Sequence, residues 1–203
     1  MLYYSKVSSQ SGISLKELND ALIEIYQKLG NRNKVLAIPP DITRFYSQAG
    51  ILTQFTYQYY RDKLTDILPS IGTHYPMTES EIKKMYGDIP LNLFRIHDWR
   101  NGLVTLGTVP SDYIKEISNG AVDYNIPIQV DKLLVEGNYD LILSIGQVVP
   151  HEVIGMANHN KNVFIGTGGA EGINKSHFLG AAYGMEKIMG RADTPVKRVR
   201  VGS

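Results

Sequence analysis

The stretch VVPHEVIGMANHNK, residues 148–161, is unusually rich in side chains that can do chemistry. It contains His151, His159 and Lys161, and a further histidine, His177, follows in the segment INKSH. An imidazole changes its charge near neutral pH, so it can accept or release a proton during catalysis or bind a metal ion. Whether these residues are surface polar groups or parts of one site depends on the elements that carry them.

Polar side chains of a catalytic type follow each of four short apolar segments. The segments and the residues after them are VLAIPP with Asp41 and Arg44, ILPSIG with His74, LILSIGQVV with His151, and NVFIG with Lys175 and His177. In open α/β sheets, ligands bind beyond the carboxyl ends of the strands. If each segment is a strand, these side chains meet at one edge of the sheet and form a shared site.

Each residue also has a structural interpretation. Arg44 could simply pair with Asp41 at the surface, and a single histidine is more often structural or solvated than catalytic. The placement of three histidines just past apparent strands favours a shared site. His97 and His159 lack this placement, so we expect them to be surface or packing residues. Lys161, at the foot of an apparent strand, would by itself be a charged residue that protects a sheet edge.

The segment GTGGAEGINKS, within residues 166–176, is a glycine-rich turn between an apparent strand and a helix. Backbone N–H groups in such a turn can hold a phosphate, which makes a nucleotide- or phosphate-binding module of the phosphotransferase kind an alternative function. The segment departs from the P-loop pattern, since Asn174 occupies the place of the last glycine. It departs from G-x-G-x-x-G at Glu171. The structural interpretation is that the glycines allow close helix packing.

The apolar pattern predicts an α/β fold, with a mostly parallel sheet flanked by helices in a three-layer, Rossmann-like arrangement. Strands are expected within residues 34–40, 65–72, 139–146 and 161–166, and a further strand within 102–110. Helices are expected over residues 14–30, 47–64, 78–87, 111–118 and 171–190, the third opened by a Thr78–Glu81 capping box. The segment TPVKRVRVGS is expected to be an extended basic tail.

Composition limits the classes of function. The chain has 203 residues, of which 43% are hydrophobic and 20% charged, and its formal net charge is +1, so neither nucleic acid nor an acidic membrane surface is expected as a partner. The absence of cysteine excludes disulfides, a cysteine nucleophile and thiolate metal ligands, and it fits a cytoplasmic protein. If histidines bind nickel here, any sulfur ligands must come from a cofactor.

Taken in order, DITR, GTHYPMTESE, GQVVPHEVIG, Lys161 and His177 resemble the N-terminal domain of the nickel-dependent lactate racemase family. Lys161 lies ten positions after His151, and His177 lies sixteen after Lys161, which is the spacing of the family. The resemblance runs from about residue 35 to 190. Each motif is weak when taken alone, and it is their common order that is specific.

The resemblance implies a racemase or epimerase of 2-hydroxy acids that uses a nickel pincer nucleotide. Lys161 would tether this cofactor through a thioamide, and His177 would be the protein ligand of nickel. His74 and His151 would act as acid and base on the substrate hydroxyl, while Asp41 and Arg44 match the residue pair that lines the family's cofactor site. Proteins that make the cofactor are implied as partners.

The sequence departs from the family in one segment. Family members carry a Ser-Gly-Gly run shortly before the tethering lysine, whereas this chain has MANHN at residues 156–160. This difference suggests a substrate other than lactate, such as a larger sugar acid. We expect residues 1–203 to be the N-terminal catalytic and cofactor-binding domain of a longer protein whose second domain is absent, and the isolated domain to be inactive.

Overall fold

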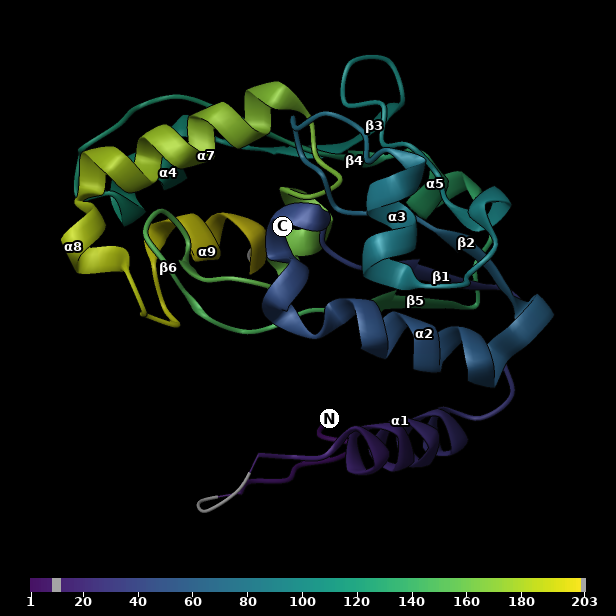
Figure 1. Cartoon of the computed structure of the whole chain (residues 1–203). Helices are drawn as coiled ribbons and strands as arrows, with labels where there is room; N and C mark the ends of the chain where they lie inside the picture. The colour runs from purple at the N-terminus through teal and green to yellow at the C-terminus, as the bar shows by residue number, and fades with distance from the viewer. Residues whose placement is uncertain (9–11, 202–203) are drawn as a thin grey trace.

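A three-stranded parallel sheet lies at the centre of the fold. The computed structural model describes residues 1–8 and 12–201. The sheet has the strand order β2 (Leu64–Ile67), β1 (Val35–Ile38) and β5 (Leu141–Ser144), and β1 pairs in parallel with both neighbours (Figure 1). Helices cover both faces, so the predicted three-layer α/β class is confirmed.

Strand β1 is buried along its whole length, and its side chains alternate between two cores. Val35 and Ala37 face a core built with α2 (Ala49–Tyr60) and α3 (Glu79–Tyr86). Leu36 and Ile38 face the opposite core, which α5 (Leu133–Glu136) and α6 (Asn160–Phe164) cover. A continuous apolar run is therefore what this central strand requires.

The first helices begin and end where their sequences indicate. Helix α1 (Leu15–Leu29) starts at a capping box formed by Ser14 and Glu17 and stops at Gly30, whose φ is 76°. Helix α3 starts at the predicted Thr78–Glu81 capping box. Helix α1 lies at the edge of the molecule beside α2 (Figure 1), where the Tyr26 hydroxyl is hydrogen-bonded to that of Thr56 at 2.7 Å.

A second core lies beside the sheet, around an antiparallel pair of strands. The pair consists of β3 (Leu103–Val109) and β4 (Ile126–Asp131). The helices around this core are α4 (Ser111–Ile117), α7 (Ala170–Tyr183), α8 (Met185–Ile188) and α9 (Pro195–Val201). Helices α7 and α8 form the predicted helical segment 171–190, with a break at Gly184, whose φ is 111°.

Three 3-10 helices and a short hairpin complete the described elements. The 3-10 helices are η1 (Ile42–Ser47), η2 (Arg61–Lys63) and η3 (Leu91–Leu93), and the hairpin strands are β6 (Pro150–His151) and β7 (Gly155–Met156). Helix η1 and the β6–β7 hairpin carry residues of the predicted site. Among residues 1–8 and 12–201, no helix is both long and apolar enough to span a membrane.

The strand expected at residues 161–166 is wrong, because this segment is helix α6. The amide N–H of Ile165 donates to the Lys161 carbonyl at 2.9 Å, and Val163 packs against the core beneath β1. A four-residue apolar run fits either a strand or one turn of a buried helix, and its periodicity cannot separate them. Lys161 therefore does not protect a sheet edge.

The extended tail expected after Thr194 is also wrong. Thr194 caps helix α9 by accepting a hydrogen bond from the Lys197 amide at 3.1 Å, and Pro195 occupies the first helical position, where it is favoured. Val196 and Val199 are buried in the second core. Their spacing of three residues is helical, and contact with α7 stabilises it.

Helix α2 packs closely on α3 at Gly50, and a substitution there can test this packing. A Cβ atom at Gly50 would lie 2.1 Å from the carbonyl oxygen of Met85, so the two helices would have to separate. We expect Gly50→Ala to lower the free energy of unfolding by about 1–3 kcal/mol in urea denaturation. Gly107→Ala is the control, since nothing lies within 4 Å of the added atom. Equal midpoints for the two variants would contradict this packing.

Candidate functional site

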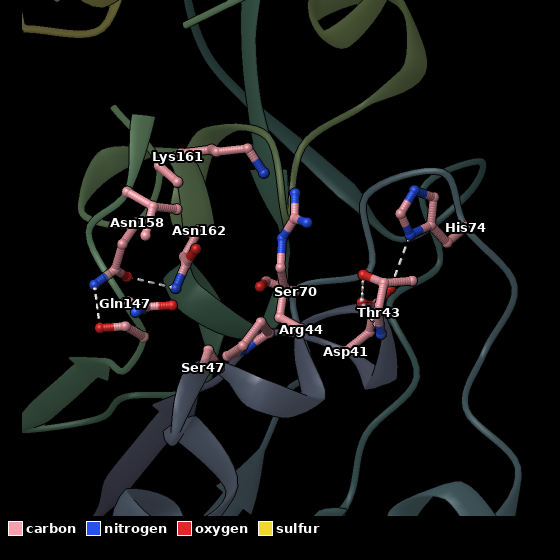
Figure 2. A pocket seen from close by; sticks show the side chains of 14 residues that line it. Asp41, Thr43, Arg44, Ser47, Ser70, His74, Gln147, Asn158, Lys161 and Asn162 are labelled. Atoms are coloured by element: carbon pink, nitrogen blue, oxygen red, sulfur yellow. Dashed lines mark hydrogen bonds and ion pairs between the residues drawn. The ribbon is translucent and has the colours of Figure 1, made fainter. Parts of the chain in front are cut away.

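A pocket opens at the carboxyl ends of the three parallel strands (Figure 2). It encloses about 550 Å³ of empty space, part of it open to solvent. The residues that line it come from the loops after β1, β2 and β5 and from α6. They are Pro40, Asp41, Thr43, Arg44, Ser47, Ser70, His74, Gly146, Gln147, Val149, Ala157, Asn158, Lys161 and Asn162. The position agrees with the rule that ligands of open α/β sheets bind at this edge.

Asp41 and His74 form a hydrogen-bonded pair in this pocket. The Asp41 Oδ2 atom lies 2.8 Å from His74 Nδ1, and Asp41 is buried, whereas the His74 side chain is 61% exposed. An ionised carboxylate only accepts hydrogen bonds, so Nδ1 carries the proton and Nε2 of a neutral ring is the basic atom. The pair therefore presents a proton acceptor to the pocket.

The backbone before Asp41 is anchored to the core. The buried Tyr86 hydroxyl donates a hydrogen bond to the Pro40 carbonyl, and the Ser70 amide donates to the Pro39 carbonyl at 2.7 Å. Asp41 then caps helix η1, because its Oδ1 atom accepts from the Thr43 amide at 3.1 Å. One carboxylate thus both starts the helix that carries Arg44 and orients the ring of His74.

Two cationic side chains point toward the same part of the pocket. Figure 2 shows the Arg44 guanidinium, which rises from η1, and the Lys161 ammonium, which extends from α6. Arg44 lies at a kink in η1, with φ of −109° and ψ of 32°. The positive charge of this region favours an anionic ligand, and a guanidinium can bind a carboxylate or a phosphate through two hydrogen bonds.

His151 is held as a neutral imidazole in the β6–β7 hairpin. Its pKa is lowered to about 4, with burial as the largest cause and the positive charge of Lys161 as the next, while His177 and Arg44 act in the same direction and Glu152 opposes them. The amide N–H of Val153 donates to its Nδ1 atom at 3.2 Å, so the proton of the neutral ring is on Nε2. The Glu152 carboxylate, 3.7 Å from Nδ1, is therefore not an ion-pair partner at neutral pH.

His177 lies on helix α7, one turn after Ile173. Its Nδ1 atom is 2.7 Å from the Ile173 carbonyl oxygen. Because a carbonyl only accepts, Nδ1 carries the proton and the lone pair of a neutral ring is on Nε2. A second hydrogen bond of this kind fixes the tautomer and ring orientation of many metal-binding histidines.

The structure brings part of the predicted site into one pocket. Asp41, Arg44, His74 and Lys161 line it. His151 and His177 are outside the lining set, although Lys161 and His177 are both close enough to His151 to lower its pKa. Within the described residues, no group of three or more His, Asp or Glu side chains could hold a metal by itself. The roles assigned to these residues stay predictions.

The glycine-rich turn at 166–169 is packed against its neighbours. A Cβ atom at Gly168 would lie 2.2 Å from the Phe164 carbonyl oxygen, and one at Gly169 would lie 2.3 Å from Gln129 Oε1. Lys175 is paired with the Glu171 carboxylate at 2.7 Å and donates to the Asn125 carbonyl at 2.8 Å. These contacts favour the structural role of the glycines over phosphate binding.

Of the two roles expected for His97, surface or packing, the structure shows the packing role. It is 2% exposed, and its Nδ1 and Nε2 atoms lie 2.7 Å from Asp131 Oδ2 and 3.0 Å from the Gly168 carbonyl oxygen. His159, the other residue left outside the site, is exposed. Sequence reasoning missed Gln147, Asn158 and Asn162. Only Gln147 had a signal, because it follows an apparent strand.

Comparisons with known proteins agree on the fold. Residues 18–187 match the sequence model of a protein family, the lactate racemase N-terminal domain. A crystal structure of a protein from Thermotoga maritima has a TM-score of 0.80 and 27% identity, covering 92% of this chain and 46% of that chain. The lactate racemase apoprotein from Thermoanaerobacterium thermosaccharolyticum has a TM-score of 0.53 and 21% identity, covering 78% and 34%. No curated protein matches the sequence.

The state of His151 can be tested by titration. We expect its imidazole NMR signals to titrate with a pKa of about 4. The unfolded chain binds a proton on this ring below about pH 6.5, while the folded chain does not until about pH 4, so acidification through this window favours unfolding. The free energy of unfolding should fall there by up to about 1.4 kcal/mol per pH unit from this group, and His151→Gln should remove that part. An ordinary histidine titration would contradict this account.

Proposed function

Because the chain belongs to the family of lactate racemase N-terminal domains, we propose that it is the cofactor-binding and catalytic domain of a racemase or epimerase of 2-hydroxy acids. The observation that carries this proposal is the pocket at the strand ends, where two cationic side chains and the Asp41–His74 pair converge. The pocket combines attraction for a carboxylate with a group that can accept the proton of a neighbouring hydroxyl.

The residues present fit a nickel pincer nucleotide. When bound, this group would supply the ring that accepts the hydride of the substrate α-carbon. Lys161 lines the pocket and would carry the group covalently, and the Nε2 lone pair of His177 would bind the nickel. An imidazole nitrogen is a suitable ligand for nickel(II), and the sulfur ligands that a chain without cysteine cannot offer would come from the cofactor.

The two remaining histidines present opposite groups to a substrate hydroxyl. With Nδ1 of His74 protonated toward Asp41, its Nε2 atom accepts a proton. With Nδ1 of His151 accepting from the Val153 amide, its Nε2–H can donate a hydrogen bond. In this state His74 would remove the hydroxyl proton, and the Nε2–H of neutral His151 would stabilise the oxygen of the resulting carbonyl through a hydrogen bond.

Arg44 would bind the anionic part of the ligand. The Asp41 carboxylate is hydrogen-bonded to His74 and to the Thr43 amide at the start of η1. The guanidinium of Arg44 and the ammonium of Lys161 therefore dominate the electrostatic potential of the pocket. A small 2-hydroxy acid carries its carboxylate next to the reacting carbon, and this anchor would hold the hydroxyl near the histidines.

A second domain would complete the active site. The chain spans less than half the length of the two solved proteins with which it was compared. The pocket is open to solvent, whereas catalysis on a small hydroxy acid requires a site closed to water. We therefore propose that residues outside this chain close the pocket and contribute to the choice between lactate and a larger sugar acid.

The proposed roles of Lys161 as the tether and of His177 as the nickel ligand can be distinguished by experiment. In protein co-expressed with the enzymes that make the cofactor, mass spectrometry should find an adduct on the Lys161 peptide, and metal analysis should find nickel. Lys161→Arg keeps the charge and should lose both the adduct and the nickel. His177→Gln should keep the adduct and lose the nickel, because only the metal ligand is removed. Full racemase activity with an unmodified, nickel-free Lys161 would exclude the proposal.

The role of Asp41 can be tested through the kinetics of the longer protein. Asp41→Asn no longer fixes the proton on Nδ1 of His74, so we expect kcat to fall by about 10²–10⁴-fold. Substrate binding should change little, because the cations of the pocket remain. Asp123→Asn is the control, since Asp123 forms a surface pair with Lys115. Racemisation followed by polarimetry at equal rates in both variants would exclude Asp41 from the acid–base machinery.

A further inference from the structure

The turn before Lys161 has a backbone conformation that normally requires glycine. Asn158 and His159 have φ values of 63° and 51°, both in the left-handed region. Asparagine tolerates this region, but for His159, with ψ of −128°, the conformation is unfavourable. These residues lie in MANHN, the segment that replaces the Ser-Gly-Gly run expected from the family. The turn therefore has a glycine-like backbone conformation although both residues carry side chains.

The Asn158 and Asn162 side chains form a brace across this turn. Asn158 Nδ2 donates to the Gly146 carbonyl at 2.8 Å, and Asn162 Nδ2 donates to Asn158 Oδ1 at 2.8 Å and to the Ile145 carbonyl at 3.2 Å. Figure 2 shows the Asn158 amide turned toward this partner and away from the Lys161 ammonium. The Asn158 amide is therefore bound to the backbone after β5 and to Asn162.

The brace connects helix α6 to the end of strand β5. Ile145 and Gly146 directly follow β5, and the amide of Lys161 donates to the Asn158 carbonyl at 3.0 Å. Asn162 is 6% exposed, so its bonds are shielded from water. Gly146 permits the contact, because a Cβ atom there would lie 3.0 Å from Asn158 Oδ1. The start of α6 thus has a defined position relative to the sheet.

We propose that Asn158 is a positioning residue for Lys161. Its amide stabilises the left-handed turn against the sheet and thereby directs the Lys161 ammonium into the pocket beside Arg44, which rests on the proposed role of Lys161 as the tether. A lysine held in this way meets an anionic reactant at a fixed distance and orientation.

Pyridoxal 5′-phosphate can test this in the 203-residue chain without any nickel cofactor. Its aldehyde condenses with a lysine amine to form an imine and water, borohydride reduces the imine, and peptide mass spectrometry locates the product. Its phosphate makes it a probe for a lysine beside a cation. We expect Lys161 to react about tenfold faster than Lys16, whose side chain is 84% exposed.

Asn158→Gly should remove most of this advantage. Glycine tolerates the positive φ, so the chain should still fold, as thermal unfolding can check, but the amide is lost. Asn138→Gly is the matched control, because Asn138 also has a positive φ, of 52°, and its Nδ2 donates to the Glu136 carbonyl, which is not among the pocket residues. Asn158→Asp keeps the acceptor for Asn162 and loses the donor to Gly146, so an intermediate rate is expected.

Three outcomes would overturn the proposal. The first is an equal Lys161 advantage in the native chain and in both Asn158 variants, and the second is no advantage in the native chain. The third is a loss of advantage in Asn138→Gly as large as in Asn158→Gly, which would show a general loosening of the chain. Failure of the nickel adduct to form in the native protein would exclude the proposed function without changing these rates, so the two failures are distinguishable.

Discussion

The burial of β1 on both faces is the constraint on which the site depends. Its four residues supply two cores at once, so the strand cannot shift or rotate without exposing apolar side chains to water. The regular strand ends at Ile38, before Pro39 and Pro40, which have no N–H to donate, although the Pro39 carbonyl still accepts from the Ser70 amide. Asp41 consequently emerges at the same edge of the sheet as the loops that follow β2 and β5.

The charged groups of the pocket fall into two sets, an acid–histidine pair and two cations. The one buried carboxylate that lines it, Asp41, is paired with His74, while Arg44 and Lys161 remain as the cations that an anionic ligand would meet. His151 experiences the same positive field together with burial, and it therefore stays neutral. In the tautomer set by the Val153 amide, the Nε2–H of this neutral ring can donate a hydrogen bond to an oxygen of a ligand.

The turn before Lys161 has a backbone conformation that is unusual for its residues. A left-handed turn of non-glycine residues is unfavourable unless other contacts stabilise it. Here two carboxamides provide these contacts by binding the carbonyl groups just after β5. The result ties the helix that carries the lysine to the strand that ends beside it, and so one hydrogen-bonded cluster links the sheet, the turn and the pocket.

The sequence by itself determined the strands β1, β2 and β5, the capped helices α1 and α3, and the placement of Asp41, Arg44 and His74 after strand ends, because local periodicity and capping residues carry that information. It did not determine that residues 161–166 form a helix or that Val196 and Val199 belong to a helix in the second core, since both depend on which neighbour buries the apolar side. The tautomer of His74 and the attachment of the Asn158–Asn162 brace to the end of β5 were likewise decided by tertiary structure, because their partners lie far away in the sequence. The tautomers of His151 and His177 depend instead on nearby backbone groups, the Val153 amide and the Ile173 carbonyl.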